Sequence, residues 1–144
     1  ESDSRVTAVE KSPDAGGFAA RNIERCGAQV DLKTGDFREL DLEFGLYDLV
    51  ISNPPYIPQN AIPLDPEVRD FDPPLALYGG EDGLDLIREI IDFAWISLRD
   101  GGMLVLEHAD GQSDQVCELL LANWQEVKAH PDPTGRLRAV SATR

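Results

Sequence analysis

The tetrapeptide Asn53, Pro54, Pro55 and Tyr56 follows directly on the apolar run 47–52. The asparagine side-chain oxygen can accept one hydrogen bond, and the carbonyl of Pro54 can accept another. Because the proline ring fixes φ, that carbonyl keeps its direction before any ligand binds. Two such acceptors suit a planar NH2 group, and the Tyr56 ring can lie against its flat face. The pattern predicts a site for an amide or an exocyclic amine; a proline-rich turn leaving a strand is the alternative.

The elements around this tetrapeptide alternate between strands and helices. We expect strands at 5–9, 28–32, 47–52 and 103–107, and a closing antiparallel hairpin of strands at 126–130 and 137–142. We expect helices at 12–27, 82–98 and 112–123, and a long, irregular, proline-rich loop over 57–81. Apolar strands between helices predict an α/β fold with a doubly wound, mostly parallel sheet.

Polar side chains stand where four of these strands end, namely Glu10, Asp36, Asn53 and Glu107. In a doubly wound sheet, ligands bind outside the carboxyl ends of the strands. Packing alone does not account for polar residues at matching ends of buried strands. The sequence therefore predicts a ligand site at this edge of the sheet.

Three blocks of the chain resemble one known family. A strand followed by Asn-Pro-Pro-Tyr is similar to class I S-adenosylmethionine-dependent methyltransferases that act on amide or exocyclic amino nitrogens. Residues 66–84 resemble the VRxxEPxxAL…GxxG segment of the HemK/PrmC family, and residues 101–108 resemble its GGxLxLEHG strand. Asp72 stands where that family has glutamate, and one extra residue separates it from Arg69. The resemblance runs from about Arg5 to the C-terminus.

The resemblance implies an activity and a place in a larger protein. HemK/PrmC proteins use S-adenosyl-L-methionine to methylate N5 of the glutamine in the Gly-Gly-Gln motif of class I peptide chain release factors. Residues 1–144 would then form the C-terminal part of the catalytic domain. The family's first strand, its glycine-rich cofactor loop and its N-terminal substrate-recognition domain have no counterpart in this sequence, which begins with Glu1. We therefore expect weak cofactor binding by the chain alone, and dimers through exposed strand edges.

The same resemblance assigns cofactor contacts to three residues near the N-terminus. Glu10 would accept the ribose hydroxyls, as acids do in dinucleotide folds. Asp36 would contact the adenine amino group, and Phe37 would stack on the ring. The alternatives are a solvated carboxylate for Glu10, a turn-forming side chain for Asp36 and a core residue for Phe37.

Substrate contacts fall on the tetrapeptide and on the long loop. Asn53, which also belongs to the expected cofactor contacts, would orient the substrate amide together with the Pro54 carbonyl, with Pro55 and Tyr56 lining the same pocket. These acceptors draw the nitrogen lone pair out of conjugation. The proton can leave after methyl transfer, so no general base is required and catalysis rests on alignment and electrostatics.

Two residues of the long loop, Arg69 and Phe71, would shape the glutamine pocket or anchor the loop. As an anchor, Arg69 would pair with Asp72 or Glu67. His108 follows Glu107 in the family's "EH" pair; a structural hydrogen bond is the favoured role, and acid–base chemistry is the alternative.

The composition excludes several classes of function. Lysine and arginine number 13 against 27 aspartates and glutamates, a net charge of −14, which disfavours direct binding of nucleic acid. No apolar run is long enough to cross a membrane. Cys26 and Cys117 are expected to be reduced, mostly buried thiols of a cytoplasmic protein, and no cluster has the spacing of metal ligands.

Two further functions stay open at this point. One is an amino-methyltransferase that acts on adenine in nucleic acid or on a ribosomal-protein glutamine. The other is a non-catalytic, methyltransferase-like interaction module.

Overall fold

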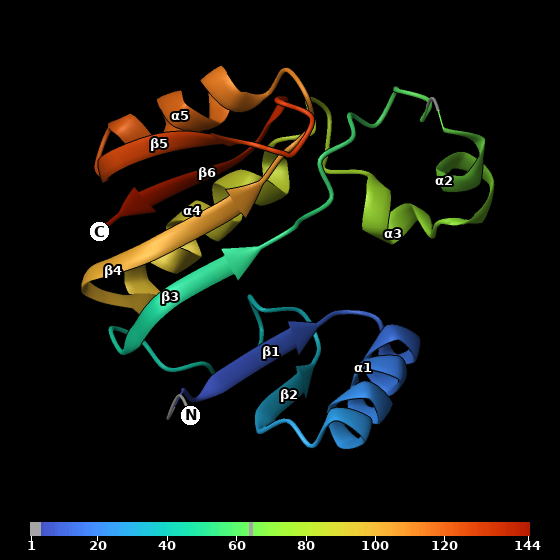
Figure 1. Cartoon of the computed structure of the whole chain (residues 1–144), viewed down its shortest axis with the longest axis vertical. Coiled ribbons are helices and arrows are strands. Elements are labelled where there is room, and N and C mark those ends of the chain that lie inside the picture. The colour runs from blue at the N-terminus through green and yellow to red at the C-terminus, as the bar shows by residue number, and fades with distance from the viewer. Residues whose placement is uncertain (1–3, 64) are drawn as a thin grey trace. The chain divides into compact units, whose positions relative to one another are not determined.

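The computed structural model describes residues 4–63 and 65–144, which fall into two compact units. The first unit extends to Leu42 and the second comprises Glu43–Arg144. Figure 1 shows one small sheet in the first unit and a larger sheet in the second.

The first unit contains strand β1 (Val6–Glu10), helix α1 (Pro13–Cys26) and strand β2 (Val30–Thr34). β1 and β2 pair in parallel over their whole length. α1 begins where it was predicted, because the Ser12 hydroxyl caps its first turn, and it ends at Gly27, whose φ of 60° is left-handed. β2 begins two residues later than the predicted strand at 28–32.

A glycine inside α1 has a packing reason that the sequence does not show. Gly16 is the buried residue of α1, and a Cβ built on it would lie 2.9 Å from Thr34 Oγ1. That separation is too short for an ordinary contact. The glycine therefore allows α1 to approach β2 closely, at a cost in helix propensity of about 1 kcal/mol relative to alanine.

The second unit is built on a four-stranded sheet. Its strands, in spatial order, are β3 (Tyr47–Ser52), β4 (Leu98–Glu107), β6 (Leu137–Thr143) and β5 (Gln125–Pro131). β3 and β4 are parallel, whereas β4–β6 and β6–β5 are antiparallel, so the sheet is mixed. The predicted closing hairpin is confirmed.

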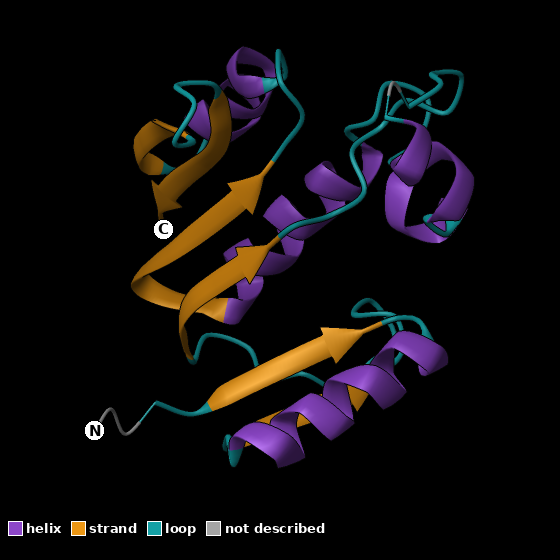
Figure 2. Cartoon of the chain, turned by 45° about the vertical axis from the view of Figure 1, so that its right-hand side comes forward, coloured by secondary structure: helices purple, strands orange, loops and turns teal. Residues whose placement is uncertain are grey.

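Helices α4 (Asp85–Ser97) and α5 (Ser113–Leu121) cover one face of this sheet. They contact each other as well as the strands, and Figure 2 shows α4 running along the β3–β4 pair. Alternate residues of β4, such as Leu104 and Leu106, are fully buried against the helices. On the opposite face Leu49, Ile51 and Met103 are exposed. Within the second unit the apolar core therefore lies between the sheet and its two helices.

The start of β4 differs from the prediction. The strand begins at Leu98, directly after α4, instead of at residue 103. Its pairing with β3 is irregular at first, and Gly101 has a φ of 76°. The glycines at 101 and 102 therefore lie inside an irregular strand and do not end a helix.

The segment predicted as an irregular loop over 57–81 contains two short helices, α2 (Pro66–Phe71) and α3 (Pro74–Leu77). Each begins with proline, which suits the first helical position. Asp65 caps α2 by accepting a hydrogen bond of 2.9 Å from the backbone N–H of Glu67. The abundance of proline indicated a loop, but here it marks helix starts.

The two sheets are separate. Over the described residues, β1 and β3 each pair along one edge only.

Cys26 is exposed and Cys117 is partly exposed, so the expectation of mostly buried thiols is wrong for Cys26. No helix of residues 4–63 and 65–144 is both long and apolar enough to span a bilayer.

Candidate active site

The tetrapeptide of residues 53–56, called the 53–56 loop below, leaves the carboxyl end of β3 as predicted. Asn53 is exposed, Pro54 is buried, and Pro55 and Tyr56 are partly buried. Figure 2 shows the chain continuing from the tip of the β3 arrow. The asparagine side chain is thus accessible from solvent, while the backbone behind it is closed against the protein.

The phenol of Tyr56 holds the loop to the neighbouring strand. Its hydroxyl donates a hydrogen bond of 3.2 Å to Oε1 of Glu107, the last residue of β4. Burial and the nearby Glu107 carboxylate both disfavour the phenolate and raise the pKa of Tyr56. The hydroxyl therefore stays protonated and remains a donor at physiological pH.

Gln112 holds the same loop from the turn before α5. Its Nε2 donates a hydrogen bond of 3.1 Å to the backbone carbonyl of Tyr56, and its Oε1 accepts one of 2.9 Å from the N–H of Ala109. The side chain is almost completely buried. Sequence reasoning placed Gln112 at the start of a helix and missed its role here. The available signal was a glutamine shortly after a predicted strand end, which is weak by itself.

The chain after the loop pairs with the segment that follows α3. The N–H of Ile57 donates to the carbonyl of Leu77, and the N–H of Gly79 donates to the carbonyl of Ile57, both at 2.9 Å. The N–H of Gln59 then donates to the carbonyl of Gly80 at 2.8 Å. These bonds form a short parallel ladder beside the loop.

Two glycines of this segment make close backbone contacts with the loop. A Cβ on Gly79 would lie 2.4 Å from the carbonyl oxygen of Pro55. A Cβ on Gly83, whose φ is 79°, would lie 2.3 Å from the carbonyl oxygen of Tyr56. Backbone atoms cannot move aside as a flexible side chain can, so only glycine fits at both positions.

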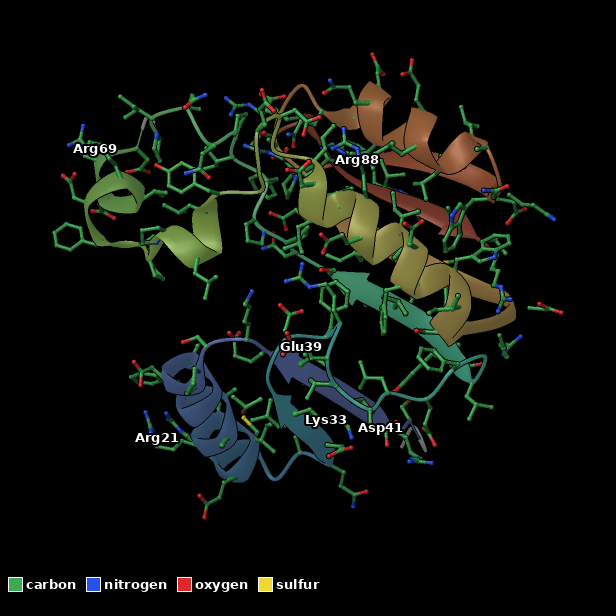
Figure 3. All side chains as sticks on the ribbon, turned by 180° about the vertical axis from the view of Figure 1, so that it is seen from behind. Arg21, Lys33, Glu39, Asp41, Arg69 and Arg88 are labelled. Carbon is green, nitrogen blue, oxygen red and sulfur yellow. The ribbon has the colours of Figure 1, made fainter. Side chains whose placement is uncertain are left out.

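The residues expected to shape the glutamine pocket lie on α2. Arg69 forms a salt bridge of 2.7 Å with its neighbour Asp70, so the expected pairing with Glu67 or Asp72 is wrong. Figure 3 shows Arg69 on the α2 segment, apart from the sheet. Phe71 has 83% of its surface exposed.

A surface depression of about 430 Å³ lies along α2, and its lining residues are Asp65, Glu67, Val68, Phe71 and Asp72. A second one of about 280 Å³ lies between the start of α4 and α5, lined by Asp82, Leu84, Arg88, Gln115, Glu118 and Leu119. Both are rich in charged side chains.

His108 is fully buried immediately after β4. Its Nδ1 lies 2.9 Å from the carbonyl oxygen of Ala109, which assigns the ring proton to Nδ1. Its Nε2 has no hydrogen-bond partner among the described residues. The geometry supplies the structural hydrogen bond that was the favoured expectation for this residue.

The first unit brings Glu10 and Asp36 to the same end of its sheet. Glu10 pairs with Thr34 at the end of the parallel ladder, and the N–H of Gly35 donates to the Glu10 carbonyl at 2.8 Å. Asp36 follows directly. The Glu10 carboxylate folds back, and its Oε1 accepts a hydrogen bond of 2.7 Å from the N–H of Ser12.

Asp36 is engaged by two cations. Its Oδ1 accepts from the backbone N–H (3.1 Å) and Nε (2.7 Å) of Arg38, and its Oδ2 contacts Arg38 Nη2 and, at 2.9 Å, Lys11 Nζ. Hydrogen bonds from Arg38, the largest cause, and from Lys11 hold the pKa of Asp36 well below its usual range. Phe37 is partly buried, with the Arg38 guanidinium 5.8 Å from its ring centre.

No cluster of histidine, cysteine, aspartate and glutamate side chains in the described part of the chain has the arrangement of a metal site. The predicted site groups that the structure places at strand ends are the 53–56 loop in the second unit and Glu10 and Asp36 in the first.

Solved structures of methyltransferases have the same fold. A methyltransferase from Pyrococcus furiosus matches 96% of the chain with a TM-score of 0.70 and 22% identity, over 62% of its own length. An O-methyltransferase from Bacillus cereus in complex with SAH matches 99% with a TM-score of 0.59 and 14% identity, over 64% of its own length. These likenesses confirm the predicted Rossmann-like α/β fold class.

No protein-family model matches the chain. A release factor glutamine methyltransferase from Streptomyces coelicolor is 47% identical over 98% of the chain and 51% of its own length. One from Mycolicibacterium smegmatis is also 47% identical, over 97% of the chain and 50% of its own length. The chain thus spans about half the length of these curated relatives. Over almost all of its own residues, the chain is similar to release factor glutamine methyltransferases.

Proposed function

We propose that the protein containing this chain uses S-adenosyl-L-methionine to methylate N5 of the glutamine in the Gly-Gly-Gln motif of class I peptide chain release factors. In this proposal residues 1–144 form part of its catalytic domain, and the protein works in the cytoplasm, where translation ends. The observation that carries it is the 53–56 loop. Asn53 is exposed at the end of β3, and the loop behind it is held at the Tyr56 hydroxyl by Glu107 and at the Tyr56 carbonyl by Gln112.

The loop would act by binding the substrate amide. The Asn53 side-chain oxygen and the Pro54 carbonyl accept the two amide hydrogens, which leaves the nitrogen lone pair available. The Tyr56 ring, fixed through its hydroxyl, lies against the flat face of the amide. S-adenosylmethionine supplies a methyl group on a positively charged sulfur. Rate enhancement then comes from alignment and electrostatics, without a general base.

The first unit offers groups that fit this cofactor unequally. One Glu10 oxygen accepts from Ser12, and the second can accept from ribose hydroxyls. Both Asp36 oxygens already accept from Arg38 or Lys11. Asp36 would therefore have to exchange one of these cations for the adenine amino group, whereas Glu10 can bind without rearrangement. Phe37 would stack on the adenine ring.

The protein substrate would contact α2 as well as the 53–56 loop. The depression along α2 carries the carboxylates of Asp65, Glu67 and Asp72 around the exposed Phe71. With a net charge of −14, the chain would attract a basic protein surface. We propose that Phe71 and Arg69 contact the release factor beside its Gly-Gly-Gln motif.

A methylation assay on the full-length protein tests this function. The enzyme is incubated with methyl-labelled S-adenosylmethionine and a purified class I release factor, or with the same factor carrying a Gln→Glu change in its Gly-Gly-Gln motif. We expect label on the first substrate only. Asn53→Ala should lower kcat by about 100-fold or more, with the Kd for the cofactor nearly unchanged, because the acceptor acts on the amide.

Asn123→Ala is the matched control, since Asn123 is exposed just after α5. It should behave like the wild-type enzyme. Wild-type turnover by Asn53→Ala, or labelling of an adenine-containing oligonucleotide in place of the release factor, would contradict the proposal.

A further inference from the structure

We propose that Gln112 is a positioning residue for this reaction, holding the peptide that follows the two prolines so that the Pro54 carbonyl keeps its direction toward the substrate. The inference rests on the proposed function of the 53–56 loop. Gln112 lies 56 positions from Tyr56 and joins the loop to the turn between β4 and α5.

The chemistry of this position requires a primary amide. Gln112 donates from Nε2 to the Tyr56 carbonyl and accepts at Oε1 from the Ala109 N–H. A carboxylate can accept but not donate, and an apolar side chain can do neither. The side chain is 7% exposed, so water does not readily replace either bond. A glutamine therefore satisfies a buried carbonyl and a buried N–H together.

The loop transmits this constraint because it has few free torsions. Proline fixes φ at Pro54 and Pro55, and no N–H of either residue can form a competing bond. Beyond them, Gln112 holds the carbonyl of Tyr56, and the N–H of the next residue, Ile57, is bonded to Leu77. Both bonds hold the one peptide plane between Tyr56 and Ile57. The proline rings before it leave few torsions through which the Pro54 carbonyl can turn away from that fixed plane.

Gly83 supports the same arrangement. A Cβ there would lie 2.3 Å from the Tyr56 carbonyl oxygen and 3.0 Å from Gln112 Nε2. Any side chain at this position would occupy the space of the donor–acceptor pair. Gly83 thus leaves room for the hydrogen bond between Gln112 and Tyr56.

The test uses the full-length protein with two substitutions of Gln112. Gln112→Leu removes the donor and the acceptor. Gln112→Glu keeps an acceptor for the Ala109 N–H, but as a carboxylate it cannot donate to the Tyr56 carbonyl. Protonation restores a donor, so activity lost by Gln112→Glu at neutral pH should return as the pH falls.

For release factor methylation at saturating cofactor, we expect Gln112→Leu to lower kcat by about 10- to 100-fold through misplacement of the acceptor, with the KM for the cofactor unchanged. The ratio of kcat for Gln112→Glu to kcat for wild type should rise as the pH falls from about 8 to about 5. Gln115→Glu is the matched control on exposed α5 surface and should show a constant ratio.

Hydrogen exchange supplies a second readout that does not depend on the substrate. The amides of Ile57 and Gln59 should exchange faster in Gln112→Leu than in wild type. Their exchange rates in Asn53→Ala should equal those of wild type. If wild type does not methylate the release factor but the exchange rates change as expected, the proposed function is wrong, while the role of Gln112 in positioning the 53–56 loop is supported. Wild-type kcat and wild-type exchange in Gln112→Leu, or a pH-independent ratio for Gln112→Glu, would overturn the inference.

Discussion

The two units hold the groups of the candidate site in different ways. In the first, Glu10 is held by Ser12 and Asp36 chiefly by Arg38, each two positions away along the chain, and Lys11 is the one distant partner of Asp36 among the described contacts. In the second, the partners of Tyr56 lie 51 and 56 positions away. The carboxylates thus depend mainly on local chain geometry, whereas the 53–56 loop depends on the tertiary fold.

This difference sets what each region tolerates. A turn held by neighbouring residues keeps its geometry when a distant contact is lost. A loop held by three separate segments loses its direction when any of them shifts. Substitutions around the loop should therefore cost more than equivalent ones around the carboxylates.

The largest expected effect is at Gly83, where an added Cβ would clash with the backbone carbonyl oxygen of Tyr56. Gly83→Ala should lower the free energy of unfolding by about 3 kcal/mol or more, because the loop must move. Gly111→Ala is the control: its φ of 88° is also positive, but nothing lies within 4 Å of the added Cβ, so about 1 kcal/mol is expected. Urea unfolding of the full-length protein measures both, and equal losses would refute the close contact.

Removing the Tyr56 hydroxyl should have the next largest effect. Tyr56→Phe should cost about 1.5 kcal/mol, since the Glu107 carboxylate loses a donor. Because the folded pKa of Tyr56 is raised, its contribution is present below the ordinary tyrosine pKa of about 10 and is lost as the pH rises through the folded value.

Stability measured against alkaline pH for wild type and Tyr56→Phe checks this prediction. The two curves should converge as the pH rises through the folded pKa of Tyr56. The tyrosinate absorbance of Tyr56, from the difference between the two titrations, should appear only above the ordinary tyrosine pKa of about 10. A constant gap between the curves would show that Glu107 and burial do not act on this phenol.

In the first unit, an added Cβ at Gly16 would meet the side chain of Thr34, which can move aside. Gly16→Ala should cost about 1 kcal/mol, because the added Cβ meets Thr34 Oγ1. Combined with Thr34→Ala, the same change should become neutral or stabilising, since alanine favours helix. A double-mutant cycle by thermal unfolding measures the coupling, and strict additivity would exclude the contact.

The smallest effect is expected at Asp36. Asp36→Asn should cost about 0.5 kcal/mol at neutral pH, because its partners are largely exposed. The depressed pKa means that this contribution is present above about pH 4 and is lost as the pH falls through the lower folded value. Asp31→Asn, which removes a pair 3.8 Å long with Lys33, is the control and should cost less at neutral pH than Asp36→Asn.

The predictable parts of the molecule are those in which neighbours in sequence decide the geometry. The Ser12 cap, the 53–56 loop at a strand end and the closing hairpin each follow from a short pattern. The carboxyl ends of β1 and β3 also carry the polar residues that the strand pattern predicted, Glu10 and Asn53.

The contacts that sequence reasoning missed are long-range. Neither the glutamine at 112 nor the glycine at 83 indicates by itself that it lies against Tyr56. Arg69 pairs with Asp70, one position away, instead of with Glu67 or Asp72, because several acidic side chains lie close to it along a short helix. Proline marked the starts of α2 and α3, where it had been interpreted as a sign of irregular chain.

The pair of prolines has one more consequence. Over two successive residues the backbone shows carbonyl oxygens and no N–H. A glutamine that has lost ammonia presents a carboxylate, whose oxygens would face other oxygens there with no hydrogen between them. If the substrate binds as proposed, these two carbonyls would distinguish an intact glutamine side chain from its deamidated form, and deamidated copies of the substrate would be excluded before methyl transfer.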